Sequence, residues 1–127
     1  MTTQVTMQNI ELLKQVIIRG SVRNSVRDSV GDSVGGSVWD SVWNSVGGSV
    51  GGFVRDSVRN SVRDSVGAYI SSFFNLKKWK YIDHKEGENP FQSYIDLWEK
   101  GIVPSFDGKV WRLHGFEGKV IYTYEGE

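Results

Sequence analysis

Cysteine is absent from this chain of 127 residues, and proline occurs only twice. Without cysteine there is no disulfide framework, no zinc–thiolate site and no thiol nucleophile. Fifteen basic and fifteen acidic residues cancel, so no net charge draws the chain towards nucleic acid or an anionic membrane. No apolar run approaches the roughly 20 residues that cross a bilayer, and no secretory signal is recognisable at the start. We therefore expect a soluble, cytoplasmic protein with no membrane partner.

A four-residue repeat dominates the first half of the chain. From Ser21 to Ala68 there are twelve tetrads, each with Val second, and each beginning with Ser except at Phe53. The third position is only Arg, Trp or Gly, and the fourth is only Asp, Asn, Gly or Ala. Because these alternatives are related by single-base changes, the array is typical of an expanded four-codon DNA repeat. Its regularity is therefore explained by DNA slippage as readily as by function.

The period of four fits neither a straight helix nor a simple strand. On a helix the Val stripe drifts by about 40° per tetrad, so it circles the helix over the whole array. Ser, Val, Asn, Asp and Gly are also poor helix formers. On a strand, Val would share a face with the acidic fourth position. A coil with Val pointing inward and corners at Asp, Asn or Gly avoids both conflicts.

These arguments predict a repeat protein with a short β-solenoid of four tetrads per coil and about three coils. The stacking would place each Trp of the array between two Arg residues of neighbouring coils, where cation–π contacts form. The residues of this predicted interaction face are Trp39, Trp43, Arg23, Arg27, Arg55 and Arg59. The design loosely resembles the pentapeptide-repeat solenoids, although this chain has no five-residue period.

A helical interpretation of the array stays open beside the solenoid. Ser at every fourth position is a small-xxx-small pattern, which allows helix backbones to pack closely. In this alternative the tetrads form long α-helices that pack through Ser/Val seams.

The two flanks of the array predict a division into three parts: an N-terminal helical cap over 1–20, the array over 21–68, and an α+β domain over 69–127. Apolar spacing predicts a cap helix over 7–19. The C-terminal part should contain a short helix, a basic loop, a second helix and a three-stranded meander. Asn89 and Pro90 mark the start of that second helix, and Asp107-Gly108 is a strong hairpin signal.

The array followed by "LWEKGIVPSFDGKVWRLHG" resembles a group of uncharacterised microbial and phage proteins. Those proteins carry Ser-Val-x-(Asp/Asn/Gly) arrays and a similar C-terminal segment. The resemblance covers residues 21–115 and implies no particular activity.

Chemistry-bearing motifs are few, and they do not favour an enzyme. His84 lies beside Asp83 and near Glu86, but a solvated polar loop explains them better than a metal or acid–base site. His114 is expected on the surface. An enzyme would need a pocket that gathers Asp83, His84 and Arg112. No phosphate-binding loop or nucleophile elbow is present, so we expect no cofactor, no metal and no catalytic residue.

Function is therefore assigned to surfaces. The first hypothesis is a non-enzymatic scaffold or protein-interaction protein that binds a partner, or a second copy of itself, through the Arg/Trp/Gly face of the array. The alternative is single-stranded nucleic-acid binding, because basic and aromatic residues alternate over 77–85. Its candidate contacts are Lys77, Lys78, Trp79, Lys80, Tyr81 and Lys85. A spacer role for the array is a further possibility.

Overall fold

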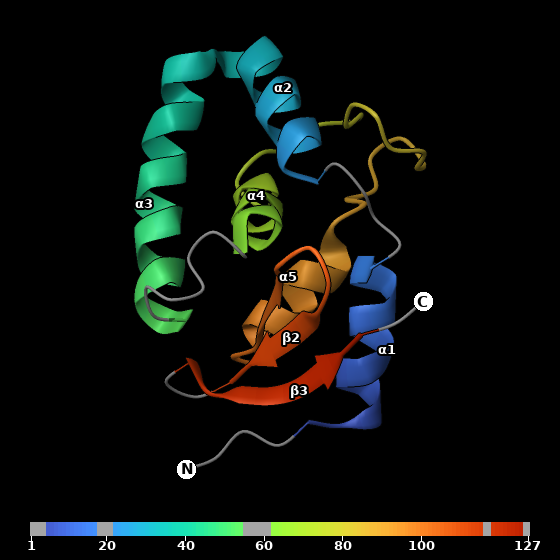
Figure 1. Cartoon of the computed structure of the whole chain (residues 1–127). Helices are drawn as coiled ribbons and strands as arrows, with labels where there is room; N and C mark the ends of the chain where they lie inside the picture. The colour runs from blue at the N-terminus through green and yellow to red at the C-terminus, as the bar shows by residue number, and fades with distance from the viewer. Residues whose placement is uncertain (1–4, 18–21, 55–61, 116–117, 126–127) are drawn as a thin grey trace.

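The computed structural model describes residues 5–17, 22–54, 62–115 and 118–125 and contains helices and one small antiparallel sheet (Figure 1). The helices are α1 (Met7–Ile17), α2 (Val22–Val34), α3 (Gly36–Val54), α4 (Arg63–Ser71) and α5 (Gln92–Glu99). The strands are β1 (Val103–Phe106), β2 (Trp111–His114) and β3 (Val120–Tyr124). In the described part of the chain, no helix is both long enough and apolar enough to cross a membrane.

The predicted β-solenoid is wrong, because the described tetrads lie in α2, α3 and the first part of α4. The drift argument assumed one unbroken element, whereas the array folds into separate helices. Gly35 interrupts it with φ +100°, a conformation that costs glycine little and other residues more. Its N–H donates to the carbonyl oxygen of Gly31 at 2.9 Å. The chain then reverses, and α3 runs back beside α2 (Figure 1).

The drift of the valine stripe is visible within these helices. Along α2, Val22, Val26 and Val30 are fully buried, but Val34 at the end is 47% exposed. In α3 the stripe returns to the core, with Val50 and Val54 buried. A stripe that turns about 40° per tetrad stays on one face for only three or four tetrads. In short helices, therefore, a valine repeat with a period of four can stay on the buried face.

Close packing of α2 against α4 depends on the small residues of the tetrads. Ser25 and Ser29 of α2 are buried, as are Ser65 and Gly67 of α4. A Cβ atom added at Gly67 would stand 3.1 Å from the Cα atom of Arg23, which is closer than ordinary contact. The backbones thus approach so nearly that a side chain at position 67 would be tightly crowded, and small-residue seams permit such packing.

The C-terminal part adds α5 and a meander in the order β1-β2-β3. Phe106 pairs with Trp111 across the Asp107-Gly108 turn, where Gly108 has φ +100°. This hairpin forms from local sequence, because Asp107 Oδ1 accepts the N–H groups of Lys109 and Val110, each at 2.9 Å. Ser65 of α4 ties the sheet to the array by donating to the carbonyl oxygen of Pro104 at 2.6 Å.

One apolar cluster joins the three parts that the sequence divides. It includes Leu13 of α1, valines of α2, α3 and α4, and Leu97 and Leu113 of the C-terminal part. Aromatic contacts cross the same junctions: Trp98 of α5 stacks on Tyr69 of α4 at 4.8 Å between centroids. The array therefore packs into the same core as its flanks.

Candidate functional site: the groove between α3 and α4

A groove of about 340 Å³ lies between α3 and the start of α4. Its walls come from four tetrads, in two adjacent pairs at 41–48 and 61–68 that are distant in the sequence. The lining residues are Trp43, Asn44, Gly47, Gly48, Val62, Arg63 and Val66. Three of these, Trp43, Gly47 and Arg63, occupy the third position of their tetrads. The Arg/Trp/Gly position of the repeat thus forms a groove wall instead of the flat face of a coil.

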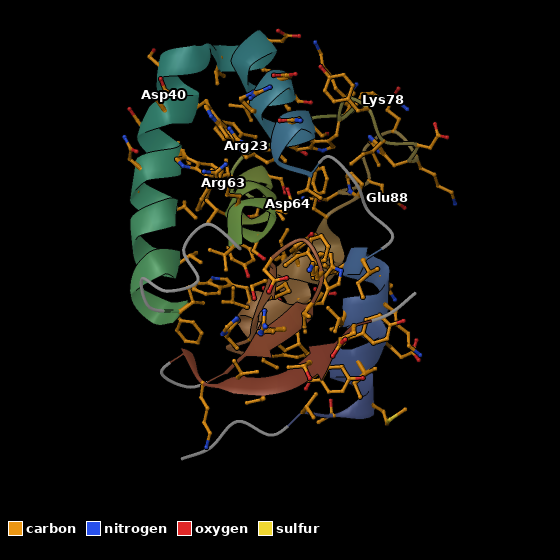
Figure 2. All side chains as sticks on the ribbon, viewed as in Figure 1. Arg23, Asp40, Arg63, Asp64, Lys78 and Glu88 are labelled. Atoms are coloured by element: carbon orange, nitrogen blue, oxygen red, sulfur yellow. The ribbon has the colours of Figure 1, made fainter. Side chains whose placement is uncertain are left out.

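Trp43 is the largest side chain in the groove, and Arg23 of α2 lies over it. The guanidinium carbon of Arg23 is 5.7 Å from the centre of the Trp43 ring, within the range of a cation–π interaction. Trp43 is half-buried and also contacts Trp39, with ring centroids 5.2 Å apart. Figure 2 shows Arg23 and Arg63 in the space between α3 and the α2–α4 pair.

The position of Arg23 is fixed through its backbone. Its N–H, in the first turn of α2, donates to Asp64 Oδ1 at 3.1 Å. Asp64 belongs to the first turn of α4, so this hydrogen bond sets the two helix starts side by side. The Asp64 carboxylate consequently binds the backbone of α2, and Asp64 is not among the residues that line the groove.

Two adjacent glycines leave the α3 side of the groove open. A Cβ atom at Gly47 would lie 4.0 Å from Trp43 Nε1 and from Val66 Cγ1, while one at Gly48 would meet nothing within 4 Å. Both positions have helical geometry and tolerate a side chain sterically. Their lack of one therefore gives the groove its width.

The predicted interaction residues do not share one surface. Trp39 is only 7% exposed and belongs to the core, so little of its ring is available as a surface contact. Arg27 makes an ion pair with its neighbour Asp28 at 3.0 Å and lines a separate hollow with Trp39. Arg55 and Arg59 lie outside the described residues. Among the described residues, the Arg–Trp columns of the solenoid are thus replaced by the contact of Arg23 with Trp43.

The basic–aromatic segment over 77–85 is largely attached to the rest of the protein. Trp79 is 1% exposed and packs edge-on against Phe91. Lys80 pairs with Asp32, and its N–H donates to Ser29 Oγ at 2.9 Å. Tyr81 donates its hydroxyl proton to Asp28 at 2.6 Å, and this hydrogen bond lowers the pKa of Asp28. Of the three central residues of this segment, Lys80 and Tyr81 are thus held by contacts with α2, and Trp79 is buried.

The remaining lysines of that segment lie on the loop, away from the groove. Lys78 Nζ donates to the carbonyl oxygen of His84 at 3.4 Å. Lys77 and Lys85 are exposed, but their carbonyl oxygens accept hydrogen bonds within the loop, from Gly87 and Glu88 respectively. Figure 2 shows Lys78 and Glu88 on the side of α2 opposite α3.

The two histidines are both engaged in local structure. His84 Nε2 accepts the backbone N–H of Trp79 at 2.9 Å. Arg112 pairs with Asp107 at 2.8 Å on the hairpin, so it does not join His84 in a pocket. Within the described ranges, no three His, Asp or Glu side chains are placed to hold a metal ion.

His114 is buried, contrary to the expectation of a surface position, with 1% of its area exposed. Its Nδ1 lies 3.0 Å from the carbonyl oxygen of Gly118, and its Nε2 lies 2.7 Å from Ser105 Oγ. Because a carbonyl only accepts, Nδ1 carries the proton and Nε2 accepts from the serine hydroxyl. Burial lowers the pKa of His114. The spacing resembles a nucleophile and its base, but Ser105 is equally buried, so the pair holds β1 against β2.

Comparisons with protein-family models, curated proteins and solved structures return no match for this chain. The groove itself is therefore the basis for any functional assignment. Sequence analysis selected Arg23 and Trp43 but missed Arg63, Asn44 and Gly47. The available signal was the third tetrad position, which Arg63 and Gly47 share with Trp43.

Proposed function

We propose that this chain is a non-enzymatic interaction protein that binds a partner protein in the groove between α3 and α4. The observation that carries the proposal is the position of Trp43, half-buried beside the groove with the Arg23 guanidinium over its ring. Trp and Arg are the side chains most often found to dominate binding energy at protein interfaces.

The arrangement is also pre-organised, which favours binding. Arg23 and Trp43 are held together before a partner arrives, so less side-chain entropy is lost on association. Gly47 and Gly48 expose helix backbone at the groove, and Val62 and Val66 supply an apolar opposite side. A partner segment would therefore meet a small apolar floor beside two arginines, instead of a flat polar surface.

The test fills the groove without removing any existing group. Leu at position 47 would project between Trp43 and Val66, whereas Leu at position 52 of the same helix enters open space. Gly47→Leu and Gly52→Leu gain similar helix propensity, so the second variant is a matched control. Circular dichroism and thermal unfolding establish that both variants keep the fold.

The three proteins are compared by affinity capture from a lysate of the source cell and by sedimentation velocity, which reports binding of a second copy. We expect partners, or self-association, to be kept by the wild type and Gly52→Leu and lost by Gly47→Leu. Equal association by all three folded proteins would overturn the proposed function.

A further inference from the structure

We infer that the partner segment which occupies the groove is acidic, with carboxylates that pair with Arg23 and Arg63. This inference rests on the proposed function, because it names the chemistry of the partner for the same groove. It is carried by the charges and donors around the groove, and by the absence of acidic side chains from its described lining.

Among the described residues around the groove, the charged hydrogen-bond donors are both guanidinium groups. Arg63 and Asn44 belong to the lining, and Arg23 lies over Trp43. In the described part of the chain, neither guanidinium donates a hydrogen bond or lies within ion-pair distance of a carboxylate. Their donors are therefore available to an approaching anion.

The acidic residue next to Arg63 in the sequence accepts a hydrogen bond from another helix. Asp64 follows Arg63 directly, but its Oδ1 accepts the backbone N–H of Arg23. The carboxylate thus stabilises the start of α2 and does not satisfy the Arg63 guanidinium. Among the described residues that line the groove, the balance of charge is therefore positive although the whole chain is neutral. Such local complementarity governs the choice of partner more than net charge does.

The identity of the basic residues favours carboxylates held with defined geometry. A guanidinium presents a planar fork that matches a carboxylate with two parallel hydrogen bonds, whereas an ammonium acts as a point charge. The cation–π contact of Arg23 involves its carbon centre and the ring, so it restrains the group without a hydrogen-bond acceptor. The valine and glycine sides require apolar or small residues between the carboxylates of the partner.

The probes are two acetylated six-residue peptides, one alternating Glu with Leu and the other alternating Gln with Leu, and a 12-mer of oligothymidylate. Binding to the full chain is followed by fluorescence anisotropy at low salt and by the indole N–H resonance of Trp43. The variants are Arg23→Gln with Arg63→Gln, the single-charge control Arg27→Gln one turn further along α2, and the Gly47→Leu and Gly52→Leu pair.

We expect the Glu peptide to bind and to shift the Trp43 resonance, and the Gln peptide to bind at least tenfold more weakly. The Arg23→Gln/Arg63→Gln protein should lose at least about tenfold in affinity for the Glu peptide, since both guanidinium groups that donate to the carboxylates are removed. Arg27→Gln should remain within about twofold of the wild type, because Arg27 pairs with Asp28 and lines a different hollow, beside Trp39.

Failure of the inference and failure of the proposed function give different results. Suppose that Gly47→Leu abolishes partner association, but the two peptides bind equally or the arginine substitutions leave peptide affinity unchanged. The groove then binds a protein that is not acidic, and the inference is overturned. If oligothymidylate shifts Trp43 and the Glu peptide does not, the ligand is nucleic acid and the inference is again overturned. If Gly47→Leu changes nothing in either assay, the proposed function itself fails.

Discussion

Asp64 Oδ1 accepts a hydrogen bond from the backbone N–H of Arg23 at 3.1 Å, across 41 residues of sequence (Figure 2). The residue that caps α2 therefore belongs to a different helix. Most helix caps are local, with the side chain two or three residues before the N–H that it satisfies. Here the cap is tertiary, so it orients α2 relative to α4 as well as stabilising the first turn. The placement of the Arg23 side chain over Trp43 depends on this relationship.

Replacing Asp64 with Ala should destabilise the protein by roughly 0.5–2 kcal/mol, the usual loss when a capping side chain is removed. Asp64→Asn keeps an accepting oxygen and should lose less of the free energy of unfolding. Urea unfolding of both variants measures the difference. Equal losses for Ala and Asn would show that the charge, and not the hydrogen bond to Arg23, is responsible.

Gly67→Ala should destabilise the protein, because its Cβ atom would stand 3.1 Å from the Arg23 Cα atom. Overpacking of a close contact costs typically about 1–3 kcal/mol, which over most of this range exceeds the roughly 1 kcal/mol that Ala gains over Gly in a helix. Gly52→Ala is the control, since it meets nothing within 4 Å and should raise the thermal midpoint. A stabilised Gly67→Ala protein would contradict the close α2–α4 crossing.

The two tryptophans of the array should respond differently to truncation. Trp39 is 7% exposed, so Trp39→Ala should lose about 3–5 kcal/mol of unfolding free energy, as large core truncations do. Trp43 is half-buried beside the groove, so Trp43→Ala should lose less stability and should weaken partner binding. Chemical unfolding and the association assays separate these effects. Comparable stability losses in both variants would mean that Trp43 serves the core.

Local sequence signals account for the parts of the fold that depend on a few neighbouring residues. The Asp107-Gly108 turn predicts a hairpin because the Asp side chain and the glycine conformation are both local, and the structure has that turn between β1 and β2. The apolar spacing over 7–19 predicts a helix, and α1 occupies Met7–Ile17. Both elements are favoured by the residues that they contain.

The helices of the array could not be predicted from local sequence signals, because they are favoured by tertiary contacts and not by helix propensity. Gly-rich tetrads form α3 although glycine disfavours helix. The stabilising features are the break at Gly35 and the close crossing at Gly67, and neither is distinguishable from the other glycines of the repeat by sequence alone. The same applies to the groove, because Arg23, Trp43 and Arg63 come together only when α2, α3 and α4 pack.

Stability should decrease on acidification because of His114. Burial lowers the pKa of this imidazole below its usual value of about 6.5, and the contacts with Gly118 and Ser105 require the neutral form. The unfolded chain therefore binds more protons than the folded chain between the folded pKa and about 6.5. The contribution of His114 is complete above that window and is lost as the pH falls through it.

Two measurements test this dependence. Urea unfolding between about pH 5 and pH 8 gives the slope of stability with pH, and His114→Gln should reduce that slope because the replacement does not titrate. The contributions of all other titrating groups are common to both proteins and cancel in the comparison. The imidazole resonances of His114 should titrate below pH 6.5 in the folded protein. A midpoint at or above that value would mean that Ser105 and Gly118 accommodate the protonated ring, and the neutral Ser105–His114 pair would have to be abandoned.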